Sequence, residues 1–248
     1  MTLSDEELAR YARHIVLREV GGIGQRKLKG ASAVVVGAGG IGSAVIPALA
    51  GAGIGRLTII DDDVVELANL HRQPLFRESD AGKPKAERAS DFARKLNRHV
   101  EVRAIQERID GANAGRLLEK HDFAIDGSDN FATRLVVSDS CVKLGMPLVS
   151  AAAVQFQGQV GLFRAMPCYR CFVGDAFDAD DCDTCAELGV LGALAATVGS
   201  FASLLAINTL VGIGEDQAGT VHLFDGTKLG WRPIRIPADP ACKACGLT

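Results

Sequence analysis

Short apolar runs alternate with longer amphipathic stretches along residues 31–155 of the chain. The short runs are rich in β-branched residues and predict strands at 34–36, 57–60, 100–105, 123–125 and 147–151. The stretches between them predict helices at 40–52, 82–97 and 111–120, and a fourth that ends near 144. Strands separated by helices in this way predict a mostly parallel sheet with helices on both faces, which is a Rossmann-like α/β fold.

The pattern changes after residue 155. Strands are predicted at 157–163, 221–224 and 231–236, and the polar turn Asp225-Gly226-Thr227-Lys228 joins the last two. These strands predict an antiparallel C-terminal extension of the sheet. We therefore expect residues 1–248 to form a single domain of three parts, which are a helical arm (1–30), a nucleotide-binding half (31–155) and a zinc-stapled half (156–248).

The local pattern makes three predictions about individual helices. Ser4 and Glu7 have the spacing of a capping box, so a helix is expected to begin at residue 5. The glycines at 21, 22 and 24 predict a break before a short helix at 25–28. Pro47 lies well inside the predicted helix 40–52 and predicts a kink or a later start.

The composition excludes several classes of function. A net charge of −3 gives no reason to expect nucleic-acid binding. The N-terminus is acidic and is not an apolar signal segment, while the apolar stretch 188–213 carries Ser200 and Asn208 and predicts a buried helix, not a membrane span. Seven cysteines without an export signal indicate thiols or metal ligands in the reducing cytoplasm.

A glycine motif follows the first predicted strand directly. Gly37, Gly39 and Gly42, with Gly40 between them, form Gly-x-Gly-x-x-Gly, and such a turn lets backbone N–H groups approach a phosphate. Asp61 follows 19 residues after the last glycine (61 − 42 = 19), close to the offset of a ribose-binding acid. The combination predicts a bound nucleotide.

Cations and acids at the ends of the predicted strands favour ATP over NAD. A triphosphate carries about four charges and calls for several basic groups with Mg²⁺ on a carboxylate. Asp126 and Asp129 follow a predicted strand at the edge where ligands bind in open α/β sheets. The further candidates for phosphate handling are Arg13, Asn69, Arg72, Lys83 and Lys85. An NAD-dependent oxidoreductase, supported by the glycine motif and Asp61, remains the alternative.

Two cysteine pairs have the spacing of metal knuckles. Cys168-x-x-Cys171 and Cys242-x-x-Cys245 supply four thiolates, which predicts a closed structural Zn²⁺ site that joins the C-terminal tail to the middle of the chain. Cys182 and Cys185 form a third pair in an aspartate-rich loop at 174–183. From spacing alone, Cys185 is a nucleophile before a helix or an inert loop thiol. Cys141 is predicted to be a core residue.

Together these segments resemble the bacterial E1-like adenylyltransferases, which activate the sulfur carriers of molybdopterin and thiamine-thiazole synthesis. The resemblance spans nearly the whole chain and includes Arg10-Tyr11-Ala12-Arg13, the glycine turn, Asp61-Asp62-Asp63, Asn69-Leu70-His71-Arg72-Gln73, Lys83-Pro84-Lys85, Asp126-Gly127-Ser128-Asp129-Asn130 and the two cysteine pairs. It implies a homodimer that uses ATP and Mg²⁺ to adenylate the C-terminal glycine of a small ubiquitin-like sulfur-carrier protein with a Gly-Gly tail, releasing pyrophosphate.

The resemblance also implies roles for individual residues. Arg72 and Lys85 stabilise the phosphates, Asp129 positions Mg²⁺, Arg13 comes from the partner subunit, and Cys185 matches a thiol with a conditional role in sulfur transfer. The nucleotide-binding set is completed by Gly37, Gly39, Gly40, Gly42, Asp61, Asp63, Asn69, Gln73 and Asn130. We expect a separate sulfurtransferase or cysteine desulfurase to supply the sulfur. A third class of function is a zinc-stapled scaffold that binds a carrier without activating it.

The sequence departs from the family pattern at two places in these segments. His71 stands where glutamine is usual, and Gly127-Ser128 stands where Cys-Thr is commoner. The molybdopterin, thiazole and other sulfur pathways use nearly the same motif set, so the sequence does not identify the carrier.

Overall fold

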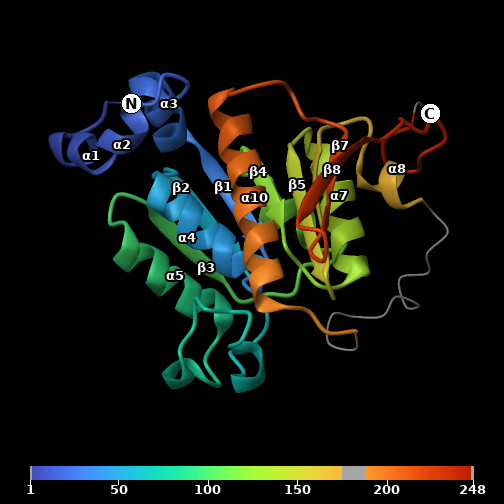
Figure 1. Cartoon of the computed structure of the whole chain (residues 1–248), viewed down its shortest axis with the longest axis horizontal. Coiled ribbons are helices and arrows are strands. Elements are labelled where there is room, and N and C mark those ends of the chain that lie inside the picture. The colour runs from blue at the N-terminus through green and yellow to red at the C-terminus, as the bar shows by residue number, and fades with distance from the viewer. Residues whose placement is uncertain (1, 175–187, 247–248) are drawn as a thin grey trace.

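The structure is a computed structural model that describes residues 2–174 and 188–246 (Figure 1). The strands of this part of the chain form an eight-stranded sheet with the order β3-β2-β1-β4-β5-β6-β7-β8. The strands are β1 Ser32–Val36, β2 Arg56–Ile60, β3 Glu101–Ile105, β4 Phe123–Asp126, β5 Leu148–Val154, β6 Gln157–Phe163, β7 Thr220–Asp225 and β8 Gly230–Arg235.

The helices lie between these strands and before the first of them. The α-helices are α1 Asp5–Arg10, α2 Ala12–Ile15, α3 Gly21–Gly30, α4 Gly42–Ala52, α5 Lys85–Leu96, α6 Ala114–Leu118, α7 Phe131–Leu144, α8 Tyr169–Val173 and α10 Gly192–Val211. Two short 3-10 helices, η1 Leu67–Asn69 and η2 Glu78–Asp80, lie between β2 and α5.

The sheet confirms the predicted fold class. Strands β1 to β5 are parallel, and β6, β7 and β8 continue the sheet as antiparallel strands. All five residues of β1 are buried, because the strand is central and has helices over both faces. The predicted turn at residues 225–228 joins β7 to β8.

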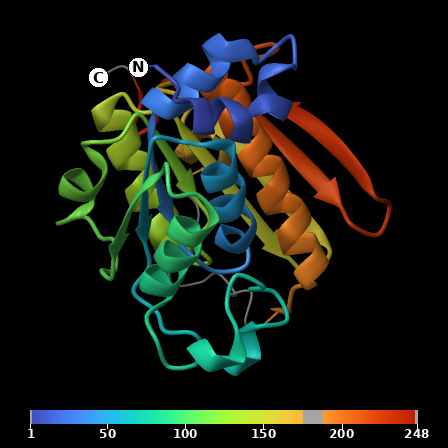
Figure 2. The ribbon, with the colours of Figure 1, turned by 90° about the vertical axis from the view of Figure 1, so that its left-hand side faces the viewer.

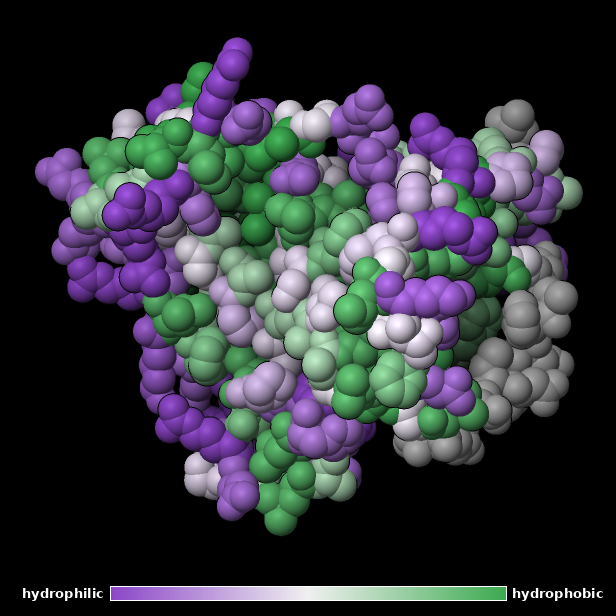
Figure 3. All heavy atoms as spheres, in the orientation of Figure 1, coloured by the Kyte–Doolittle hydropathy of each residue, from purple (hydrophilic) through white to green (hydrophobic). Residues whose placement is uncertain are grey.

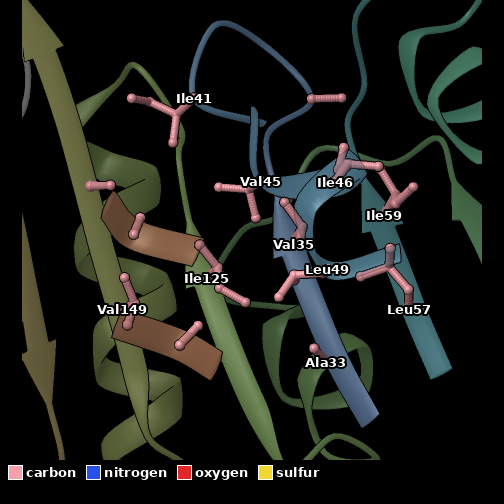
Figure 4. Packing of buried hydrophobic residues seen from close by; sticks show 14 of the residues in the cluster. Ala33, Val35, Ile41, Val45, Ile46, Leu49, Leu57, Ile59, Ile125 and Val149 are labelled. Carbon is pink, nitrogen blue, oxygen red and sulfur yellow. The ribbon is translucent and has the colours of Figure 1, made fainter. Parts of the chain in front are cut away.

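Two apolar cores lie on the two faces of the sheet. On one face α4, α5 and α10 cover the strands, and Val35, Leu49 and Ile125 interdigitate there (Figure 4). On the other face α6 and α7 cover a second core, which includes Cys141 as predicted (Figure 2). The helix α10 is long and apolar enough to cross a membrane by length and composition. It packs against α4, β5 and β6, so it is the buried helix predicted for 188–213.

The arm packs against its own domain through side-chain contacts. The capping box is present as predicted, because Ser4 N–H donates to Glu7 Oε2 at 2.8 Å and Glu7 N–H donates to Ser4 Oγ at 3.3 Å. Tyr11 is 3% exposed, and its hydroxyl accepts a hydrogen bond from Asn97 Nδ2 at 2.8 Å. The arm lies at one end of the molecule, and the segment between β2 and α5 lies at the other (Figures 1 and 2).

One prediction about helices is wrong. The glycines at 21, 22 and 24 do not together break the helix, because α3 begins at Gly21, which has φ = +55°, and continues through Gly22 and Gly24. Gly24 is needed for packing, since a Cβ there would lie 2.7 Å from Val211 Cγ1 at the end of α10. The helix α4 begins at Gly42, two residues later than predicted, and holds Pro47 in its interior, so a kink at Pro47 stays a prediction.

Candidate functional site

The glycine turn connects β1 to α4 at the edge where β1, β2 and β4 end. Gly37 has φ = +90°, which is a conformation that residues with a Cβ rarely adopt. A Cβ at Gly37 would also lie 3.1 Å from the backbone of Gly127 and Ser128, so the turn packs directly on the loop after β4. At Gly42 an added Cβ would lie 2.2 Å from the carbonyl oxygen of Gly37. Both glycines are therefore required by the close approach of the backbone.

A cavity of about 330 Å³ opens beside this turn. Its size falls in the range of small-molecule sites. The predicted site residues that line it are Gly37, Gly39, Gly40, Asp61, Asp63, Arg72, Gln73, Lys85 and Asp129. The structure thus brings together nine residues from five separate segments of the sequence. Gly42 lies beneath the turn and not in the wall of the cavity.

Asp61 holds the backbone of the turn as well as lining the cavity. Its Oδ2 accepts a hydrogen bond from Ala38 N–H at 2.7 Å, and its Oδ1 accepts one from Asp63 N–H at 2.9 Å. Burial raises the pKa of the Asp61 carboxyl, and these two backbone donors oppose that rise. A ribose hydroxyl that reached this carboxylate would meet an acceptor already oriented by the fold.

Arg72 is oriented by its neighbours in the loop after η1. Its Nη2 donates to Asn69 Oδ1 at 2.6 Å, and its Nη1 lies 2.8 Å from Nε2 of His71. Asn69 does not line the cavity, so in this structure it acts on the site through Arg72. The sequence analysis assigned no partner to His71, and the structure shows one.

Lys85 and Gln73 are buried polar residues in the cavity wall. Lys85 is 4% exposed and pairs with Asp63, whose Oδ2 lies 2.9 Å from the ammonium. Gln73 is 3% exposed, and its Oε1 is buried without a hydrogen-bond partner in the part of the chain that the structure describes. A buried amide oxygen without a donor is costly, so Gln73 is suited to a ligand that donates a hydrogen bond.

Asp129 and Asn130 differ in their surroundings although they are adjacent in sequence. Asp129 is exposed at the cavity edge, and none of the described residues donates a hydrogen bond to its carboxylate. Asn130 caps α7, since its Oδ1 accepts from Thr133 N–H at 2.8 Å. It borders a smaller hollow next to the main cavity, beside Asp129. Oxygen ligands suit Mg²⁺, and Asp129 fits that role.

Two residues of the cavity wall, Ser128 and Arg134, were not assigned a binding role by the sequence analysis. Asp126 is fully buried, and its Oδ1 accepts hydrogen bonds from the N–H and the hydroxyl of Ser128 at 2.9 and 2.7 Å. The Ser128 carbonyl in turn accepts a hydrogen bond from Arg134 in α7. Arg134 lines the cavity and belongs to α7, whereas Arg72 belongs to the loop after η1. The only sequence signal for Arg134 is its position four residues after the cap of a helix that borders the site.

Arg13 does not line the cavity of its own chain. It is exposed on α2, in the arm at the opposite end of the molecule (Figure 2). The exposed apolar side chains Leu8, Val16, Leu17 and Ile23 lie on the same arm. Figure 3 shows apolar residues gathered over this part of the surface, at the upper left.

The four predicted zinc ligands form a cluster. The sulfur atoms of Cys168 and Cys242 are 3.6 Å apart, those of Cys171 and Cys245 are 3.4 Å apart, and all four lie within 4.8 Å of one another. A tetrahedral site with Zn–S bonds of about 2.3 Å requires sulfur atoms about 3.8 Å apart. The cluster is therefore compatible with a closed Zn²⁺ site, which would supply structural support and no open position for chemistry.

The cysteine cluster is tied to α7 through its surroundings. Arg170, inside the first knuckle, donates to both carboxylate oxygens of Asp139 at 2.7 and 2.8 Å. Burial raises the pKa of the Cys168 thiol to about 11, so a bound cation would have to displace its proton. The predicted roles of Cys182 and Cys185, and most of the loop 174–183, lie outside the described residues.

The sequence profile of the ThiF family matches residues 11–244. The chain belongs to the ThiF family. It is 42% identical to a sulfur carrier protein adenylyltransferase of Thermus thermophilus, over 99% of this chain and 93% of that protein. It is 36% identical to the molybdopterin-synthase adenylyltransferase of Escherichia coli, over 98% of each chain. It also spans 56% of an adenylyltransferase and sulfurtransferase of Culex quinquefasciatus, with 41% identity.

The fold of this ThiF-family chain occurs in solved structures. The crystal structure of MccB from E. coli superimposes with a TM-score of 0.85 and 25% sequence identity, over 100% of this chain and 74% of that chain. The likeness confirms the α/β fold and its antiparallel extension.

Proposed function

We propose that this protein uses ATP to adenylate the C-terminal glycine carboxylate of a small ubiquitin-like sulfur-carrier protein, with release of pyrophosphate. The observation that carries the proposal is the convergence of Arg72, Lys85 and Asp129 on the cavity beside the glycine turn. The printed names of the Thermus and E. coli relatives, both adenylyltransferases, support the same reaction.

The residues of the cavity suit the charge changes of this reaction. The carboxylate of the carrier attacks the α-phosphorus, and the bond to the leaving pyrophosphate breaks, so negative charge increases on the leaving oxygens. Arg72 and Lys85 are fixed by hydrogen bonds before any ligand binds, and cations held in this way stabilise that charge without reorganising. Gly37 and Gly40 line the cavity, so a phosphate there could approach the backbone of the turn closely.

Asp129 would hold the Mg²⁺ that accompanies a triphosphate. Its carboxylate is exposed at the cavity, and no described residue donates a hydrogen bond to it, which leaves it available as an oxygen ligand. Bound Mg²⁺ would neutralise part of the phosphate charge. Asp61, Asp63, Asn69, Gln73 and Asn130 complete the proposed nucleotide site.

The protein would act as a homodimer with Arg13 donated across the interface. The support is geometric, since Arg13 is exposed on an arm far from the cavity of its own chain and beside exposed apolar side chains. A test is to mix Arg13→Ala subunits with Asp129→Ala subunits. If each site takes Arg13 from the partner, the mixed dimer regains one complete site, whereas both parent dimers are inactive. Failure of the mixture to regain activity would contradict the shared site.

Carrier adenylation can be tested by direct product detection. The protein, ATP, Mg²⁺ and a ubiquitin-like carrier ending in Gly-Gly are incubated together, and mass spectrometry looks for carrier–AMP. Asp129→Ala should abolish this product and ATP–pyrophosphate exchange, while Asp216→Ala, an exposed acid remote from the cavity, should leave both intact. An unmodified carrier with wild-type protein would support a binding scaffold instead. Tight NAD binding without ATP binding would support an oxidoreductase.

Candidate carriers should be taken from both the molybdopterin and the thiazole pathways, since the proposed site does not distinguish them. A persulfide-bearing sulfurtransferase or cysteine desulfurase would consume the adenylate. We further propose that residues 1–248 act as one adenylation domain in the cytoplasm.

A further inference from the structure

Arg134 is a buried cation in the cavity wall, and none of the described residues forms an ion pair with it. It is 6% exposed, and its guanidinium donates to the Ser128 carbonyl and, at 3.2 Å, to Ser150 Oγ. Both of these acceptors are neutral. A guanidinium stays protonated, and its charge is costly to bury without a counter-charge. The other buried cation of the wall, Lys85, has the carboxylate of Asp63 as its partner.

Asp126 positions the Arg134 guanidinium through Ser128 but forms no ion pair with it. One carboxylate oxygen accepts both hydrogen bonds from Ser128, and the other, Oδ2, is buried with no hydrogen-bond partner in the described chain. Asp126 therefore holds Ser128, and Ser128 holds the guanidinium. The consequence is a cation in a fixed position with hydrogen-bonding capacity left for a ligand, because five N–H donors meet two protein acceptors.

The position of Arg134 separates it from the phosphate-handling residues. Arg72 comes from the segment between β2 and α5 and Lys85 is the first residue of α5, whereas Arg134 reaches the cavity from α7. The wall on its side continues over Ala152 and Gly158, which are small residues of β5 and β6. A Cβ at Gly158 would lie 2.4 Å from Val198 Cγ2, so Gly158 leaves no space beneath it. The small residues of this wall suit a narrow chain, and the guanidinium without an ion-pair partner favours one that ends in an anion.

We propose that Arg134 binds the terminal carboxylate of the carrier and holds one of its oxygens toward the α-phosphorus of ATP. This inference rests on the proposed function. A guanidinium matches a carboxylate with two parallel N–H donors, which fixes orientation as well as position. Positioning of this kind converts a bimolecular attack into an intramolecular one.

The chemistry needs no proton transfer at Arg134. A carboxylate oxygen forms a bond to the α-phosphorus, the bond from that phosphorus to the bridging oxygen breaks, and pyrophosphate leaves with the electron pair. The cation offsets the repulsion between the approaching carboxylate and a triphosphate of about four negative charges. Arg134 thus has a separate task from Arg72 and Lys85, which contact the phosphates.

The test compares two forms of one ubiquitin-like carrier that ends in Gly-Gly, one with a terminal carboxylate and one with a terminal carboxamide. Binding of each form is measured by calorimetry in the presence of Mg²⁺ and α,β-methylene-ATP, which cannot transfer its adenylyl group to the carrier because the bridging oxygen is replaced by carbon. Wild-type protein should bind the carboxylate form tighter by about 30-fold or more. In Arg134→Gln the two forms should bind equally, and Arg134→Lys should retain part of the preference.

The comparison separates this role from a structural one. Loss of packing at Arg134 would weaken both carrier forms alike, and thermal melting of Arg134→Gln and Arg134→Lys reports whether they fold. Arg116→Gln, which removes an exposed cation paired with Glu107, should keep the full preference. If Arg134→Gln lost affinity for the ATP analogue and for the carrier by the same factor, the guanidinium would be inferred to bind a phosphate, and the inference would be overturned.

The outcome is distinguishable from failure of the proposed function. If wild-type protein forms carrier–AMP but Arg134→Gln still prefers the carboxylate form, only the role of Arg134 is overturned. If wild-type protein forms no carrier–AMP from ATP, the proposed function itself fails.

Discussion

Replacing Gly42 by alanine tests whether the glycine turn positions the nucleotide. The added Cβ would lie 2.2 Å from the carbonyl oxygen of Gly37, whereas ordinary contacts begin at 3.4 Å. The two groups must therefore separate by about 1.2 Å (3.4 − 2.2 = 1.2), and no flexible side chain can absorb the shift, because the Cβ is bonded directly to the backbone and the oxygen belongs to it. We expect a cost of about 1–3 kcal/mol in the free energy of unfolding, which is typical of overpacking.

The effect on activity should exceed the effect on stability. A displacement of about 1 Å in a group that positions substrate lowers activity by about 100-fold, so kcat/KM for adenylation should fall by about that factor. ATP affinity is measured by calorimetry and stability by urea unfolding. The matched control is Gly51→Ala in the same helix, where an added Cβ meets no atom within 4 Å. It should raise stability by up to about 1 kcal/mol and leave ATP binding unchanged. A Gly42→Ala protein that binds and uses ATP like the wild type would refute the reasoning.

Three further predictions concern pH, metal and the arm. Burial raises the pKa of Asp61, so on acidification the affinity for adenosine should begin to fall at a higher pH than it would if Asp61 had the pKa of an ordinary aspartate. Below the pKa of Asp61 the affinity should fall by about tenfold per pH unit. The Asp61→Asn variant should show no such pH dependence. The free energy of unfolding should change with pH in the opposite direction. Because the pKa of Asp61 is higher in the folded state, protonation of Asp61 stabilises the fold at pH values below its unfolded-state pKa, and this stabilisation is lost as the pH rises through its folded-state pKa. Urea unfolding of the wild type and of Asp61→Asn at several pH values tests this. Removing zinc with a chelator, or replacing Cys245→Ser, should lower Tm by about 5 °C or more, which corresponds to about 2 kcal/mol. Metal analysis checks that the zinc has been removed. If the melting curve is then unchanged, the zinc site does not stabilise the fold. Tyr11→Phe should cost about 1 kcal/mol in urea unfolding, because it removes the buried hydrogen bond from Asn97, and an unaltered midpoint would show that this bond does not hold the arm.

The predicted elements were correct where the pattern of burial is regular. The run of valines at the end of β1 and the alternation of strands and helices reflect which faces of each element are buried. The local spacing of apolar residues is enough to predict that burial. The prediction at residues 21–24 failed because glycine is ordinarily taken to break a helix, and the sequence alone does not show which residue packs against it in the fold. At Gly24 the neighbour is Val211 of α10, which is 187 residues away in the chain (211 − 24 = 187). Tertiary contact overrode local propensity there.

The candidate site was predicted to the extent that its residues follow strands. Parallel strands end at one edge, so Asp61 and Asp129 were expected near the glycine turn, and they are. Asn130 and Asn69 were expected beside the nucleotide, yet the structure shows one capping α7 and the other holding Arg72. The residue type alone does not distinguish these roles, because the side-chain oxygen of an asparagine can accept a hydrogen bond from the backbone, from another side chain or from a ligand.

Arg134 shows why the remaining part of the site could not be read from the chain. An arginine in the first turns of a helix is ordinarily a solvated charge, and nothing in its local sequence distinguishes it from Arg116. What distinguishes it is that β5 and the loop after β4 close over it, leaving a charge with two neutral acceptors. A fold keeps an uncompensated buried cation only at a cost in stability. A carboxylate of the substrate that binds at Arg134 would supply the counter-charge and offset this cost. Because the site is desolvated, the guanidinium then attracts the carboxylate more strongly than it would in water.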